Sequence, residues 1–65
     1  MSLITLTDGR VVSKKDYIQA KTKDLVEFGY TNLTEDEVAV QVEHILAKEE
    51  ISVIGHFCKD DIKVD

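Results

Sequence analysis

The sequence predicts a mainly α-helical α+β domain in which three short helices pack with an N-terminal β-hairpin. Two observations lead to this prediction. An Asp-Gly pair separates two short runs of β-forming residues near the N-terminus, and two helix start signals are each followed by apolar residues at helical spacing. A chain of 65 residues has room for one small domain, which buries only about 60% of its unfolded surface. We therefore expect a single domain over residues 1–65.

The first expected element is a β-hairpin with strands near residues 3–7 and 10–13. Apolar and polar side chains alternate from Ile4 to Thr7, and Val11-Val12 follows the turn. The Asp8-Gly9 pair favours a tight turn, because both residues tolerate the positive φ angles that the turn requires. Two strands alone are marginally stable in water, so one face of the hairpin is expected to pack on the helices.

A first helix is predicted over residues 14–28. Ser13 is its expected N-cap, and Asp16 lies three residues later, where the helix dipole favours a carboxylate. Gly29 follows the helix at the position where a left-handed residue commonly ends one. Apolar residues recur with a helical period at Ile18, Leu25 and Phe28, with Tyr17 and Ala20 beside them.

A second helix is predicted over residues 35–48. Thr34 and Glu37 form a capping box, and Leu33 before the cap can pack on Val38 inside the helix. Acidic residues in the first turn and Lys48 in the last both complement the helix dipole. The apolar face of this helix consists of Val38, Val42, Ile45 and Leu46.

The C-terminal stretch fits two structures. Counted from Ile54, the residues Phe57, Cys58 and Ile62 lie at +3, +4 and +8, which is the helical pattern, and Ser52 is a plausible N-cap. We predict a third helix near residues 52–60. The alternative is a third strand over residues 51–58, which would give two helices on a small three-stranded antiparallel sheet.

The expected core draws on every element, and it is filled mainly with aliphatic side chains. Its members are Ile4, Leu6, Val12, Ile18, Leu25, Phe28, Leu33, Val38, Val42, Ile45, Leu46, Ile54 and Phe57. So small a body leaves little volume for a pocket in which reactive groups could converge.

The candidate reactive groups are His44, His56 and Cys58, and none of them forms a complete motif. His56 and Cys58 lack the second ligand pair of a structural zinc site, and a Cys-His nucleophile would need an orienting group and an oxyanion site. The three glycines lie too far apart for a phosphate-binding loop. We therefore expect no catalytic, cofactor-binding or metal site, and we expect a protein that is not an enzyme.

Charge is distributed unevenly along the chain, whose formal net charge is −5. Residues 31–65 are strongly acidic, which disfavours nucleic-acid binding by the surface as a whole. A local basic group surrounds the start of the first helix, where the helix dipole also favours anions. It consists of Arg10, Lys14, Lys15, Lys21 and Lys23, and it is the candidate contact for an anion or nucleic acid.

These observations favour a small non-catalytic protein-interaction or regulatory module, with homodimerisation as one form of the interaction. The candidate partner contacts are Tyr17, Tyr30, Val40, Val53 and Phe57. The alternative is a nucleic-acid-binding accessory protein that uses the basic group. A single cysteine suits a reducing compartment, and no apolar run approaches the roughly 18 residues that span a bilayer, so we expect a cytoplasmic protein with no membrane contact.

Overall fold

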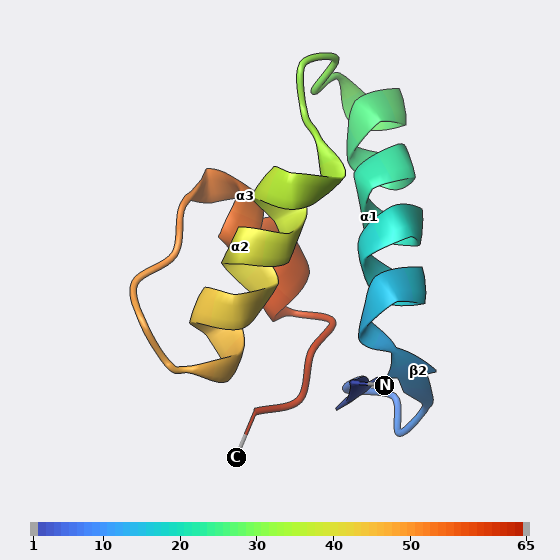
Figure 1. The fold of residues 1–65 in the computed structure, drawn as a ribbon, viewed down its shortest axis with the longest axis vertical. Coiled ribbons are helices and arrows are strands. Elements are labelled where there is room, and N and C mark those ends of the chain that lie inside the picture. The colour runs from blue at the N-terminus through green and yellow to red at the C-terminus, as the bar shows by residue number, and fades with distance from the viewer. Residues whose placement is uncertain (1, 65) are drawn as a thin grey trace.

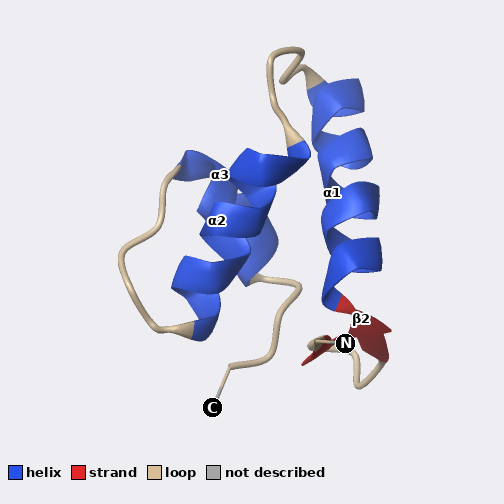
Figure 2. Ribbon diagram, in the orientation of Figure 1, coloured by secondary structure: helices blue, strands red, loops and turns tan. Residues whose placement is uncertain are grey.

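The computed structural model describes residues 2–64 and contains a two-stranded hairpin followed by three helices (Figures 1 and 2). In chain order the elements are β1 (Leu3–Thr5), β2 (Val11–Ser13), α1 (Lys14–Phe28), α2 (Glu35–Leu46) and α3 (Val53–Lys59). Figure 1 shows α1 along one side, with α2 and α3 packed together beside it and the hairpin at the foot of α1. The predicted mainly α-helical α+β fold is confirmed.

The hairpin is antiparallel, and Ile4 of β1 pairs with Val12 of β2. The C-terminal segment pairs with the opposite edge of β1, because the Thr7 amide donates to the Asp61 carbonyl and the Lys63 amide donates to the Thr5 carbonyl, both at 2.9 Å. The alternative of a strand over residues 51–58 is wrong, since this stretch contains α3. Extended pairing with the hairpin occurs instead just after α3.

The helix boundaries follow local signals that the sequence carries. Ser13 Oγ accepts from the Asp16 amide at 3.1 Å, and Thr34 Oγ1 accepts from the Glu37 amide at 3.3 Å, so both predicted N-caps are confirmed. Gly29 ends α1 with a φ of 136° and donates to the Val26 carbonyl. This is the left-handed turn that closes many helices.

The end of α2 uses the same kind of turn without a glycine. The helix stops at Leu46, two residues before the predicted end, and Lys48 takes a positive φ of 59°. The amide of Glu49 donates to the His44 carbonyl at 2.8 Å and closes the turn. Few residues other than glycine adopt this conformation without strain.

The packing of α3 on α2 depends on a side chain and a glycine. The Ser52 side chain makes no capping bond; instead Gln41 Oε1, from α2, accepts from the Ser52 amide at 2.9 Å. A Cβ on Gly55 would lie 2.5 Å from Ile51 Cβ and 2.8 Å from Gln41 Oε1. The two segments can approach this closely because residue 55 has no side chain.

The core lies between the three helices and the inner face of the hairpin. Its buried members are Ile4, Leu6, Tyr17, Ile18, Leu25, Val38, Val42, Ile45, Cys58 and Ile62. Val12, Leu33, Ile54 and Phe57 are partly buried against it, in keeping with the prediction. None of the helices within residues 2–64 is long and apolar enough to cross a membrane.

Two predicted core residues are exposed, and three buried members of the apolar core were not predicted. Phe28 is 73% exposed and Leu46 is 39% exposed. Each is the last residue of its helix, where the neighbouring elements no longer cover the apolar face. The buried residues that were not predicted are Tyr17, Cys58 and Ile62. They are enclosed by contacts between α1, α3 and the C-terminal segment.

The contact at Gly55 leads to a stability prediction. In an open helix, replacing glycine with alanine stabilises by roughly 0.5–1 kcal/mol. At Gly55 the added methyl group overlaps Ile51 and Gln41, so we expect Gly55→Ala to lower the free energy of unfolding by about 1–3 kcal/mol. Urea unfolding followed by circular dichroism measures this difference, and a more stable Gly55→Ala variant would contradict the proposed close packing.

Candidate functional site

Three aromatic rings pack together where the end of α1 meets α3. The ring centroids of Phe28 and Tyr30 are 6.3 Å apart, those of Phe28 and Phe57 are 5.8 Å apart, and those of Tyr30 and Phe57 are 5.6 Å apart. Tyr30 and Phe57 are partly buried against the core, whereas Phe28 is largely in solvent. Val53 precedes Phe57 by one helical turn and is 64% exposed. We call Phe28, Tyr30, Val53 and Phe57 the aromatic surface.

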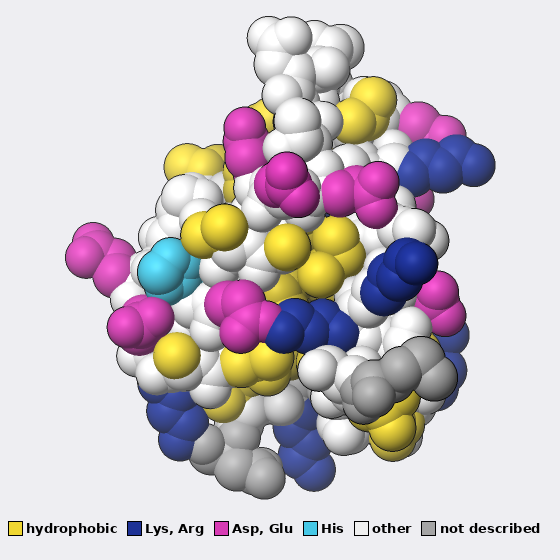
Figure 3. Space-filling view, viewed as in Figure 1, with side chains coloured by type: hydrophobic (Ala, Val, Ile, Leu, Met, Phe, Trp, Pro, Cys, Tyr) yellow, Lys and Arg dark blue, Asp and Glu magenta, His cyan; other side chains and the backbone are white. Residues whose placement is uncertain are grey.

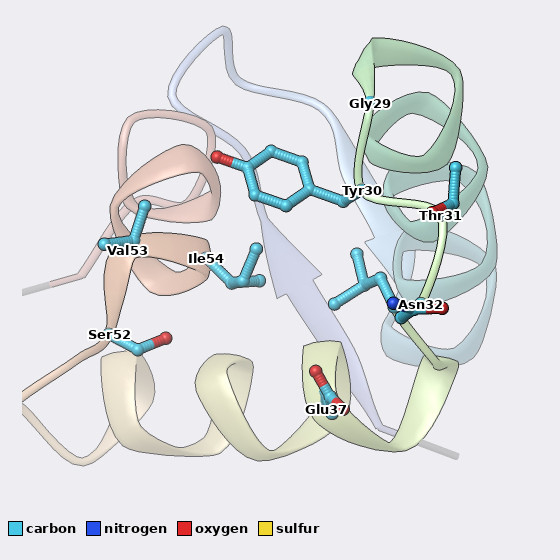
Figure 4. A pocket seen from close by; sticks show the side chains of 9 residues that line it. Gly29, Tyr30, Thr31, Asn32, Glu37, Ser52, Val53 and Ile54 are labelled. Carbon is cyan, nitrogen blue, oxygen red and sulfur yellow. The ribbon is translucent and has the colours of Figure 1, made fainter.

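Local structure explains why these side chains meet. Gly29 ends α1 directly after Phe28, and the Tyr30 amide donates back to the Leu25 carbonyl at 3.0 Å. This turn reverses the chain, so that the Tyr30 ring reaches toward α3 (Figure 4). The tight contact at Gly55 seats α3 on α2 and thereby fixes where Val53 and Phe57 lie.

An open groove of about 520 Å³ adjoins the aromatic surface (Figure 4). Residues 29–33 form one wall, the start of α3 forms another, and Glu37 of α2 lies beneath. A smaller hollow, lined in part by Val40 and Asp36, shares Glu37, Ser52 and Ile54 with this groove. The two hollows therefore adjoin each other along the junction of α2 and α3.

The structure brings together four of the five predicted partner contacts. Tyr30, Val53 and Phe57 belong to the aromatic surface, and Val40, 50% exposed, lines the smaller hollow. Tyr17 does not join them, because it is buried and therefore unavailable as an exposed partner contact. Sequence reasoning missed Phe28, which it assigned to the core; its position directly before the helix-ending Gly29 was the available signal.

Tyr17 belongs to a polar cluster that ties the C-terminal segment to α1. Its hydroxyl donates to Asp61 Oδ2 at 3.0 Å, and Lys21 Nζ contacts the same oxygen at 2.8 Å. Cys58 is fully buried beside this cluster. Burial raises the pKa of the Cys58 thiol and of the Tyr17 hydroxyl, so both groups stay protonated at neutral pH. A buried, protonated thiol is a poor nucleophile.

The predicted basic group is largely neutralised by carboxylates. Arg10 Nε lies 2.7 Å from Asp8 Oδ2, Lys14 pairs with Glu43, and Lys21 pairs with Asp61. Lys15 and Lys23 are exposed, and within residues 2–64 neither forms an ion pair. Neutralisation reduces the positive potential that a nucleic acid would meet at this surface.

The histidines and the cysteine lie apart from one another. His44 Nδ1 is 3.0 Å from Glu49 Oε1 near the end of α2, and His56 is exposed on α3, whereas Cys58 points into the core. Over the part of the chain that the structure describes, no three His, Cys, Asp or Glu side chains group as metal ligands would.

Comparisons with known proteins add no further information. No family model, no curated protein and no solved structure matches the chain.

The buried thiol and phenol lead to a prediction about alkaline stability. Above the ordinary pKa values of 9.0 for cysteine and 10.0 for tyrosine, the unfolded chain loses these protons while the folded chain retains them. The unfolded state then binds fewer protons, so the free energy of unfolding falls as the pH rises from about 9 to 11. Each group contributes a negative slope of at most about 1.4 kcal/mol per pH unit.

Urea unfolding at several pH values measures this slope. Tyr17→Phe removes one titrating group and should flatten the decline above pH 10, while leaving the contribution of Cys58 in place. An unfolding free energy that stays constant up to pH 11 would show that the two groups are not shielded in the folded chain.

Proposed function

We propose that this protein is a non-catalytic interaction module that binds a partner protein through the aromatic surface. The main observation behind the proposal is that Phe28 is 73% exposed although it packs with two other aromatic rings. Fully burying a phenylalanine side chain is worth roughly 1.5–3 kcal/mol, so a partner that covers this ring gains much of that free energy. Aromatic side chains are also enriched among the residues that dominate binding energy at interfaces.

The surroundings of Phe28 favour binding in a second way. Tyr30 and Phe57 both pack near its ring, with centroids 6.3 and 5.8 Å away, so the side chain is partly ordered before a partner arrives. Ordering a mobile side chain at an interface costs roughly 0.5–1.5 kcal/mol. A ring that is already partly ordered avoids part of this cost.

The dimensions of the molecule are compatible with such an interface. A standard interface covers about 800 Å² of each partner, which is roughly a fifth of the 4532 Å² that this chain exposes. The aromatic surface and the two adjoining hollows together offer a continuous face that combines apolar side chains with polar ones.

The proposal is tested by site-specific photo-crosslinking in cells. A photoreactive phenylalanine analogue at position 28 should give one defined protein adduct. The same analogue at Gln19, which is exposed on the opposite side of α1, should give none. Val53→Asp places a charge beside the aromatic surface and should reduce the adduct at position 28 at least tenfold, because burying an unpaired charge opposes binding.

The identity of the adduct distinguishes two forms of the proposal. An adduct with a second copy of this chain would mean a homodimer, and an adduct with another protein would identify the partner. The proposal fails if positions 28 and 19 give the same adducts, or if Val53→Asp leaves the adduct at position 28 unchanged.

A further inference from the structure

We infer that the aromatic surface and its hollows bind a cationic amphipathic segment of another protein, in which apolar side chains alternate with Lys or Arg. This inference rests on the proposed function and adds the chemistry of the partner. Three features support it: the charge of the chain around the aromatic surface, the charged residues inside the hollows, and the way the hollows join.

Acidic residues outnumber basic ones in residues 24–47, the stretch of chain that contributes Phe28 and Tyr30 to the aromatic surface. Between Lys23 and Lys48 the chain has no Lys or Arg. The acidic residues of the same stretch are Asp24, Glu27, Glu35, Asp36, Glu37 and Glu43. In Figure 3, acidic side chains lie beside hydrophobic ones in the upper half of the molecule, while Lys and Arg are found mainly in the lower half and along the right edge. The part of the groove lining that comes from this stretch therefore contains an acidic side chain, Glu37, and no basic one.

The hollows themselves carry only negative charge. Asp36 and Glu37 are the charged side chains among the residues that line them. Both are exposed, and within residues 2–64 neither carboxylate forms an ion pair. Thr34 Oγ1 accepts from the backbone amide of Glu37. The Glu37 carboxylate takes no part in this hydrogen bond and is free to meet a cation.

The shared lining of the hollows fits an extended or helical segment. Because both hollows contain Glu37, Ser52 and Ile54, a segment laid along them contacts Tyr30 at one end and Val40 at the other. Its apolar side chains then cover Ile54, and its basic side chains lie next to Asp36 and Glu37. Recognition by alternating anchors of this kind is a common way of binding peptides.

Charge also disfavours two other occupants. A nucleic acid would be repelled by the acidic residues at this face. In a second copy of the chain, three of the eight basic side chains are already paired within residues 2–64, namely Arg10, Lys14 and Lys21, and its net charge of −5 opposes its approach to this acidic face. Its hollows that contain lysines also contain carboxylates: Glu49 and Glu50 lie with Lys48 and Lys59, and Asp16 and Glu35 lie with Lys14 and Lys15.

The test uses two synthetic peptides with the same apolar pattern, one built of Leu and Lys and the other of Leu and Glu. Binding to the full chain is measured by fluorescence anisotropy at low and at physiological salt. We expect the Leu/Lys peptide to bind at least tenfold more tightly than the Leu/Glu peptide. Its affinity should fall as salt screens the charges.

Matched variants locate the binding site. Asp36→Lys/Glu37→Lys should weaken binding of the Leu/Lys peptide at least tenfold, and the neutral variant Asp36→Asn/Glu37→Gln should do so by a smaller factor. Glu49→Lys/Glu50→Lys changes the net charge equally at the other end of α2 and should alter affinity less than threefold.

Phe28→Ser/Val53→Ser should weaken binding at least tenfold through loss of apolar contact. Circular dichroism checks that each variant is folded.

Several results would overturn the inference. These are equal binding of both peptides, equal losses for the Asp36/Glu37 and Glu49/Glu50 variants, or no effect of Phe28→Ser/Val53→Ser. A concentration-dependent dimer in sedimentation that the Asp36/Glu37 variant abolishes would assign the face to a second copy instead. If the Leu/Lys peptide does not bind but crosslinking at position 28 succeeds, the partner chemistry is wrong and the proposed function stands. If both fail, both proposals are wrong.

Discussion

The close approach of α3 to α2 at Gly55 is the contact on which the rest of the structure depends. A hydrogen at this position, in place of a methyl group, lets the start of α3 lie against Ile51 and Gln41. Gln41 in turn accepts from the amide of Ser52, directly before α3. With α3 seated in this way, Cys58 is fully enclosed in the core and the chain can return along β1. The same placement brings Phe57 to the end of α1, where it packs with Phe28 and Tyr30, and leaves Val53 exposed one helical turn earlier.

The molecule separates the side chains that hold it together from those available to a partner. The residues that are completely buried are of moderate size, Val38, Val42 and Cys58. The phenylalanines lie at the margin or outside: Phe57 is partly buried, and Phe28 is mostly exposed. Among the large apolar side chains that are exposed in residues 2–64, Phe28 is the most exposed, and this is why we propose that it contacts a partner. The acidic residues of the adjoining hollows, Asp36 and Glu37, are the basis of our inference that the partner is positively charged.

Local signals made much of the fold predictable. Ser13, Thr34 and Gly29 act on their own neighbours along the chain, so the boundaries of α1 and the start of α2 could be predicted. Tyr17 and Phe28 could not be placed correctly, because their exposure depends on where α3 and the C-terminal segment lie. The sequence indicated Tyr30, Val53 and Phe57 as separate contacts, but only the folded chain shows that they meet. The capping of α3 by Gln41 and the neutralisation of the basic group are likewise contacts between distant segments.

The central claim is that Phe28 is held by the fold but is not needed for it. The most direct test compares the free energies of unfolding of Phe28→Ser and Val42→Ala with that of the unmodified chain, by urea titration. The account predicts that Phe28→Ser costs about 1 kcal/mol, from lost contact with two rings, whereas Val42→Ala costs about 2 kcal/mol or more because it opens a cavity at a fully buried position. A loss for Phe28→Ser as large as that for Val42→Ala would show that the ring belongs to the core and would contradict its assignment as a binding residue.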